Sequence, residues 1–252
     1  AAFFLLPLAR LVAAGWEGTG AAGYAAILSE PRYLAALRDT VLLSAGVAAA
    51  AVALAAVVGT TLARTRFRGR RLLVALLTLP LAFPGVVVGF MVILLAGRQG
   101  VIGTATEALT GERLVFAYSF AGLCLGYLYF SLPRCIATVM AAAEGLDPAL
   151  EEAARTLGAG PWRVARDVII PGLAPALVAS GAIVFATCMG ALGTAFTLAT
   201  DIRVLPMVIY TEFTLATNFS VAAALSVLLG VVTWVALAVA RVFGGNNVAA
   251  QA

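Results

Sequence analysis

Residues 151–171 read EEAARTLGAGPWRVARDVIIP and combine three acidic with three basic side chains in an otherwise apolar chain. The whole sequence has no Lys and no His, so all sixteen basic residues are Arg. These side chains can form ion pairs and recognise a surface. They supply no imidazole for general base catalysis and no Schiff-base lysine. The segment is therefore a candidate for binding a partner rather than for catalysis.

Several kinds of site are excluded by the same composition. A nucleotide-binding P-loop needs a Lys on the phosphates, and this chain has none. Cys124, Cys135 and Cys188 do not form a CxxC pair, lie in or beside apolar runs, and are best explained as free buried thiols. We therefore predict that the chain is not an enzyme and binds no metal or cofactor itself.

The composition is that of a membrane protein. Hydrophobic residues make up 63% of the 252 residues and charged residues 11%, against about 25% in ordinary soluble domains. An Ala-rich soluble helical protein is the alternative, but the apolar runs reach the roughly 20 residues that span a bilayer. Five complete spans are predicted at residues 40–63, 72–96, 114–133, 173–200 and 221–242. Residues 1–15 are apolar but too short, and we interpret them as the end of a first, incomplete span.

The arginines predict the orientation of this six-helix bundle. If the spans alternate, ten arginines fall on the side of the 151–171 segment and five on the other. The positive-inside rule then places that segment and the C-terminus in the cytoplasm. The net charge of +4 could suggest a nucleic-acid partner, but the arginines cluster between the spans, which argues against one. Basic loops of this kind can also bind anionic membrane lipid.

Two short helices are predicted within the insert. Asp147 and Pro148 are typical of a helix start, and residues 158–160 (Gly-Ala-Gly) of its end. Pro161 can open a second helix, which Pro171-Gly172 would close. The first helix carries one apolar stripe, formed by Leu150, Ala153, Ala154 and Leu157. The second helix turns three larger side chains away from its apolar face: Trp162, Arg163 and Arg166. Such a pair suits insertion into a partner's groove, or could lie flat on lipid.

The insert resembles the cytoplasmic signature of ATP-binding-cassette (ABC) importer permeases: EAA, three residues, Gly, nine residues, then Ile-x-Leu-Pro. Glu152-Ala153-Ala154 is followed at the same spacing by Gly158 and then by residues 168–171, with Val for Ile and Ile for Leu. In that family the insert docks in a cleft of a separate ATPase. The resemblance implies that ATPase coupling is carried by these residues: Glu152, Ala153, Ala154, Gly158, Trp162, Val168, Ile170 and Pro171.

The resemblance further implies a single permease domain over residues 1–252, with the coupling insert at 141–172, in the bacterial inner membrane. Its implied partners are two ATPase subunits, which carry the ATP and magnesium, and a periplasmic or lipid-anchored solute-binding protein. A second permease subunit is also implied, and we expect a related chain in preference to a second copy. A secondary transporter or channel is the alternative class, but it would have no use for the insert.

The predicted spans contain no carboxylate, so the candidate substrate path is made of hydroxyl groups. Thr187, Thr194 and Thr197 are spaced to share one face of a helix, and the polar residues of the third complete span add two tyrosines, Tyr127 and Tyr129. Each hydroxyl could instead bond to backbone. The stretches VLPMVIYTEFT (204–214) and FSVAAALSVLLG (219–230) resemble permeases for polyamines, aminoethylphosphonate, ferric iron, thiamine, sulfate or molybdate. A polyamine or similar small organic cation is our expectation.

Overall fold

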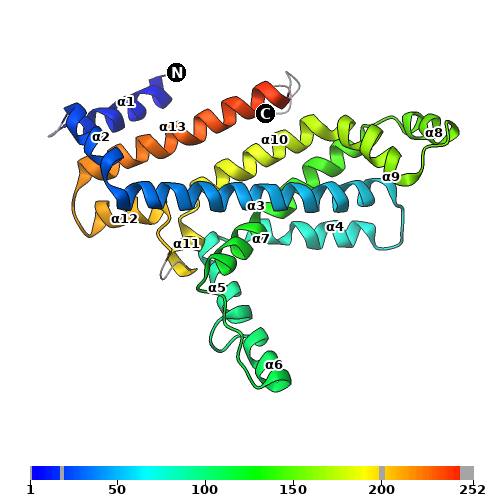
Figure 1. The fold of residues 1–252 in the computed structure, drawn as a ribbon, viewed down its shortest axis with the longest axis horizontal. Coiled ribbons are helices and arrows are strands. Elements are labelled where there is room, and N and C mark those ends of the chain that lie inside the picture. Colours follow the sequence, from blue (N-terminus) through cyan, green and yellow to red (C-terminus); the bar gives the residue numbers. More distant parts are fainter. Residues whose placement is uncertain (1, 18–19, 199–201, 245–252) are drawn as a thin grey trace. The chain divides into compact units, whose positions relative to one another are not determined.

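The computed structural model describes residues 2–17, 20–198 and 202–244. Over these ranges the chain forms helices and turns and no strands, which confirms the predicted all-α class (Figure 1). The contacts divide the chain into two units, each assembled from three separate segments. Unit 1 contains residues 1–46, 84–127 and 186–235, and unit 2 contains residues 47–83, 128–185 and 236–252.

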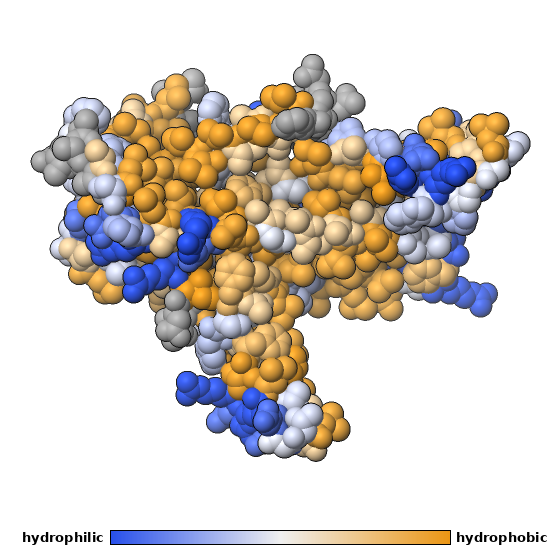
Figure 2. Space-filling view, viewed as in Figure 1, coloured by the Kyte–Doolittle hydropathy of each residue, from blue (hydrophilic) through white to orange (hydrophobic). Residues whose placement is uncertain are grey.

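Within the described residues, five helical segments are long and apolar enough to cross a membrane. They are α3 (Pro31–Arg64), Gly85–Thr110, α7 (Phe120–Glu144), Pro161–Met189 and Phe219–Val242, the last within α13 (Phe219–Gly244). The N-terminal α1 (Ala2–Trp16) has 15 residues, fewer than the roughly 20 that span a bilayer, and α2 (Gly20–Ser29) follows it. The described residues thus contain as many membrane-length segments as predicted, with a shorter first helix, although the bounds of some segments differ. Their surfaces, such as those of α10 and α13, are mainly hydrophobic (Figure 2).

The predicted span at residues 72–96 is wrong as a single helix. The chain forms α4 (Arg70–Thr78), a 3₁₀ turn (Leu79–Ala82) and then α5 (Gly85–Ala96). Phe83 is extended, because Pro84 disfavours helical backbone at the residue before it. The membrane-length segment instead joins α5 to α6 (Val101–Thr110).

The predicted span at residues 173–200 is also interrupted. Helix α10 (Ile170–Met189) ends before residues 190–192, and the short α11 (Gly193–Leu198) begins afterwards. Thr200, the end of the prediction, lies outside the described residues. By contrast, α7 continues through Pro133 to Glu144, beyond the predicted end. A proline within a membrane helix is tolerated where neighbouring groups satisfy the freed carbonyl.

In unit 1 the short helix α12 (Leu205–Thr214) packs on the first turns of α3 and on α13. Their buried side chains form one apolar cluster that includes Tyr33, Leu205 and Leu225. Thr40 on α3 donates its hydroxyl to the carbonyl of Ala36 and accepts from the amide of Leu205 at 2.8 Å. This threonine therefore joins α3 to the start of α12.

In unit 2 small residues let the helices approach closely. A methyl group at Gly59 of α3 would lie 3.1 Å from Val139 and from the amide nitrogen of Met140 on α7. One at Gly181 of α10 would lie 3.0 Å from Val52 of α3. Close backbone approach through Gly is typical of membrane helix pairs. The later part of α3 is therefore packed against both α7 and α10.

Candidate functional site

The insert begins with the predicted helix start. Helix α8 (Pro148–Thr156) has Asp147 as its N-cap, and the Asp147 carboxylate accepts from the amide of Ala149 at 2.9 Å. Pro148 occupies the first turn, where its missing N–H costs nothing. Capping of this kind contributes about 1 kcal/mol. The sequence prediction for this end is confirmed.

The predicted end of the first helix is also confirmed. Gly158 has φ +82° and follows the last turn of α8, and a side chain added there would meet open space. The amide of Ala159 closes the turn by donating to the carbonyl of Ala154 at 3.0 Å. A glycine in the left-handed region is the common way to end a helix. Backbone conformation, rather than lack of room, explains why Gly stands at 158.

The second half of the insert differs from the prediction. Helix α9 (Pro161–Val164) passes through one π-helical turn (Ala165–Ile169) directly into α10. Pro171 and Gly172 therefore do not close a separate short helix. The amide of Ile170 donates to the carbonyl of Ala165, five residues back. We attribute the continuity to this wider turn, which leaves room beside the ring of Pro171.

The side of the insert predicted to bind a partner is uncovered in this chain. Leu157 is 88% exposed, Trp162 77% and Leu150 54%, while Val164 is buried. Figure 2 shows hydrophilic atoms gathered beside hydrophobic ones around α8 and α9. Exposed large apolar side chains in a cluster mark an interaction surface. Two of the predicted coupling residues, Ala154 and Val168, are half-buried. The other six are exposed: Glu152, Ala153, Gly158, Trp162, Ile170 and Pro171.

Glu151, which was not predicted as a site residue, is buried at 6% exposure. Its Oε1 lies 2.6 Å from a guanidinium nitrogen of Arg64, the last residue of α3. Its Oε2 accepts from Arg155 at 3.2 Å. The i, i+4 spacing to Arg155 was visible in the sequence. The pair with Arg64 had no local signal, because it joins two distant elements.

Further contacts fasten the ends of the insert. Arg64 also donates to the carbonyl of Leu146 at 3.4 and 3.5 Å. The Leu146 side chain lies against Gly172, where an added methyl group would come within 2.8 Å of it. Arg70 binds Glu144 at 2.5 Å and donates to the carbonyl of Leu62 at 2.7 Å. The residues that enter and leave the insert are therefore tied to each other and to the end of α3.

The predicted substrate-path hydroxyls are mostly bonded to backbone. Tyr127 donates to the carbonyl of Ala191 at 2.5 Å, and Thr194 to that of Gly85 at 3.0 Å. Thr197 donates to the carbonyl of Thr194 at 2.9 Å, within α11. An added methyl group at Gly89 of α5 would lie only 1.6 Å from the Thr197 hydroxyl, so these threonines serve close packing of α5 on α11.

The shared helix face predicted for the three threonines is wrong. Thr187 is exposed on α10, and the chain turns at residues 190–192 before Thr194 and Thr197 begin another helix. The three threonines of unit 1 therefore do not lie on one helix face. Tyr129 on α7 is 38% exposed. The role of all five predicted residues in the substrate path remains a prediction.

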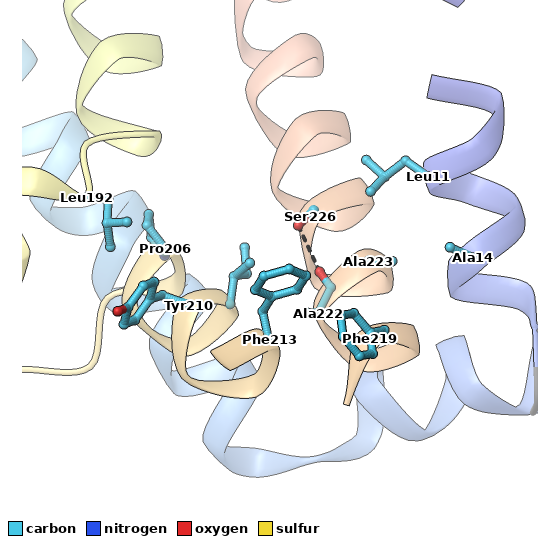
Figure 3. A pocket seen from close by; sticks show the side chains of 11 residues that line it. Leu11, Ala14, Leu192, Pro206, Tyr210, Phe213, Phe219, Ala222, Ala223 and Ser226 are labelled. Carbon is cyan, nitrogen blue, oxygen red and sulfur yellow. Dashed lines mark hydrogen bonds between the residues drawn. The ribbon is translucent and has the colours of Figure 1, made fainter. Parts of the chain in front are cut away.

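Unit 1 also contains an apolar pocket of about 410 Å³ that the sequence did not indicate. Its lining residues come mainly from α1, α12 and α13 (Figure 3). Its one hydroxyl on α13, Ser226, donates to the carbonyl of Ala222 at 2.7 Å. None of its lining residues is charged: Leu11, Ala14, Leu192, Pro206, Ile209, Tyr210, Phe213, Phe219, Ala222, Ala223 and Ser226.

The fold and the insert can be compared with known proteins. A family model described as "Binding-protein-dependent transport system inner membrane component" matches residues 51–245. The molybdenum transport system permease protein ModB of Escherichia coli (strain K12) is 37% identical over 154 residues, which cover 60% of this chain and 66% of ModB. The sulfate transport system permease protein CysT of the same strain is 36% identical over 199 residues, covering 79% of this chain and 70% of CysT.

Solved structures share the fold. A bacterial alginate ABC transporter, in complex with an alginate pentasaccharide-bound periplasmic protein, aligns over 94% of this chain and 87% of its own. The TM-score is 0.81 at 18% sequence identity. The family match covers most of the residues on both sides of the insert as well as the insert itself. The chain therefore belongs to the family of binding-protein-dependent transport system inner membrane components, the permease subunits of ABC transporters.

Proposed function

We propose that the chain forms half of the membrane path of an ABC importer and couples it to a separate ATPase. The observation that carries this proposal is the exposed insert. The left-handed Gly158 follows α8, and the side chains of Leu157 and of Trp162 on α9 are exposed. A surface of this kind has no structural use in the isolated subunit. It suits a groove on a partner.

We further propose an oxyanion such as molybdate or sulfate as the substrate, in place of the polyamine expected from the sequence. The relatives reported above are named for molybdenum and sulfate. The buried carboxylates of the described residues, Glu151 and Glu212, are each ion-paired with an arginine. An organic cation would be stabilised by a carboxylate that no arginine already neutralises, and neither of these two glutamates offers one. Aminoethylphosphonate, ferric iron and thiamine remain alternatives.

The partners follow from the same proposal. Two ATPase subunits would supply ATP and magnesium, and a second permease subunit would complete the path. A solute-binding protein would deliver the substrate, as the periplasmic protein in the alginate transporter complex suggests. The insert and C-terminus would face the cytoplasm. Of the predicted path residues, Thr187 and Tyr129 are exposed enough to meet a substrate.

The assembly is tested by gentle purification from native membranes and mass spectrometry of the intact complex. Two ATPase subunits bound to this chain and a second permease would support the proposal, and two copies of this chain would indicate a homodimeric core. Recovery of the chain alone under every mild condition, together with ATP-independent solute flux in liposomes, would favour a channel instead.

The substrate and the coupling are tested by uptake. Cells that lack this chain should lose uptake of radiolabelled molybdate or sulfate and keep uptake of putrescine. Gly158→Asp should abolish the restored uptake at normal expression, because it places a charge and a strained residue at the docking turn. Normal uptake by this variant would contradict the coupling role of the insert.

A further inference from the structure

Among the described residues of the insert, Glu151 is the one buried carboxylate. Its charge must therefore be stabilised by the groups around it. A carboxylate taken out of water needs a paired charge or several hydrogen bonds. Both oxygens of Glu151 face an arginine, Arg64 at 2.6 Å and Arg155 at 3.2 Å. The next residue, Glu152, is exposed. The two adjacent glutamates therefore have different surroundings and, we argue, different roles.

The two arginines are not equivalent. Arg155 lies one turn further along α8, so its pair with Glu151 stays within that helix. Arg64 is the last residue of α3, so its pair joins two elements. The Arg64 guanidinium and Glu151 Oε1 are close enough for an ion pair, but their relative orientation does not form a hydrogen bond. Arg64 also holds the carbonyl of Leu146, just before α8, and is itself only 27% exposed.

Helix α8 has nine residues and needs such an anchor. Isolated helices of fewer than about 12 residues are marginal in water, so packing must hold them. Leu150 of α8 and Leu157, the residue after it, are exposed and do not contribute that packing. The contacts of Glu151 and Leu146 with Arg64 fix the first turn of α8 to the end of a membrane-length helix.

We propose that the Arg64–Glu151 pair is a positioning contact which makes α8 move together with the end of α3. Glu151 would act by holding the insert, while Glu152 and the exposed apolar residues face the ATPase. Force applied to α8 by a partner would then reach α3 directly, as well as through the continuous helix from Pro161 to Met189. This inference rests on the proposed coupling function, but the anchoring itself can be measured without any partner.

Anchoring is tested by hydrogen exchange of the purified full-length chain in detergent. Glu151→Gln should make the amides of α8 exchange about tenfold faster, because Arg64 loses its charged partner. Glu107→Gln is the matched control, since Glu107 pairs with Arg113 on the exposed surface of α6 and should leave α8 unchanged. Arg155→Gln should have a smaller effect on α8 than Glu151→Gln. Unchanged exchange in Glu151→Gln would overturn the anchor.

Coupling is tested in proteoliposomes that contain the intact complex, by counting solute transported per ATP hydrolysed. Glu151→Gln should lower this ratio several-fold while ATP hydrolysis continues, and the exchanged pair Arg64→Glu with Glu151→Arg should restore part of it. A wild-type ratio in Glu151→Gln, with faster exchange in α8, would overturn the positioning role. A wild-type complex that transports nothing with ATP would contradict the proposed function, and the exchange data would still decide the anchor.

Discussion

The two ends of α3 hold a buried glutamate in the same manner but in different surroundings. In unit 1, Arg32 at the start of α3 lies 3.2 Å from Glu212 of α12. In unit 2, Arg64 at the end of α3 lies 2.6 Å from Glu151 of α8. Each glutamate is 6% exposed, and each belongs to a short helix of nine or ten residues. In both units an arginine at an end of α3 fastens a helix too short to be stable alone.

The difference lies in the remaining partners of each carboxylate. Glu212 accepts from the hydroxyl of Tyr33 at 3.0 Å, and the guanidinium of Arg32 lies 4.4 Å from the centre of the Tyr33 ring. Tyr33 also belongs to the apolar cluster that buries α12. Glu151 has two arginines and lies in an insert with an uncovered apolar face. One helix is held mainly by packing, whereas the other depends on its ion pair and keeps its outer face free.

The largest expected effect is at Arg64. Arg64→Ala should destabilise the chain by about 3 kcal/mol, because it leaves a buried carboxylate without its cross-element partner. Arg32→Ala should cost about 1 kcal/mol, since Arg32 is 53% exposed and Tyr33 still donates to Glu212. Thermal unfolding in detergent measures both. An equal or larger loss in Arg32→Ala would show that the two ends do not differ as described.

Replacing both members of the Arg64–Glu151 pair sharpens this prediction. Arg64→Met with Glu151→Leu should recover most of the stability lost in Arg64→Ala, because a buried ion pair can often be replaced by apolar groups of similar volume. A double variant no more stable than Arg64→Ala would show that the loss came from packing of the Arg64 stem instead. The same thermal measurement distinguishes the two explanations.

Tyr33→Phe tests the neutral donor at the other end. We expect a loss of about 1.5–3 kcal/mol, the usual contribution of a hydrogen bond to a charged group. The combination of Tyr33→Phe with Arg32→Ala should cost more than the sum of the two changes, because Glu212 would then have no donor from α3. Simple additivity in thermal unfolding would mean that the two residues stabilise Glu212 independently.

Gly158 and Gly111 form a matched pair for the coupling turn. Both follow a short helix, both have positive φ, +82° and +77°, and neither has an atom within reach of an added methyl group. Ala at either position should cost about 1–2 kcal/mol through backbone strain. Only Gly158→Ala should also lower transport. Equal transport losses in the two variants, at equal stability, would show that the Gly158 turn has no special part in coupling.

The smallest effect on stability is expected on the exposed face of the insert. Trp162→Ala and Leu157→Ala should each change the free energy of unfolding by less than about 0.5 kcal/mol, because neither side chain packs on this chain. Both should weaken association with the ATPase, measured by its recovery with the purified chain. Leu109→Ala on α6, where Leu109 is 85% exposed, is the control that should leave that recovery unchanged.

Much of the fold could be read from local patterns. Apolar runs such as the one over residues 40–63 predict membrane helices because length and hydropathy alone satisfy the bilayer. The α8 start at Asp147 and the turn at Gly158 were likewise predictable, since capping and positive φ are local properties of the backbone. The helix breaks at residues 79–84 and 190–192 were missed, because tertiary packing decides whether a Pro or Gly in an apolar run ends a helix.

The sequence by itself determined the class of protein, the position of the insert and the residue types that could carry coupling. Only the tertiary structure decided that Glu151, rather than Glu152, is buried, and that its partner is Arg64 at the end of α3. It also decided that Thr194 and Thr197 pack on α5 instead of sharing a helix face with Thr187. Hydropathy and capping act over a few residues, whereas an ion pair between distant helices forms only where packing brings them together.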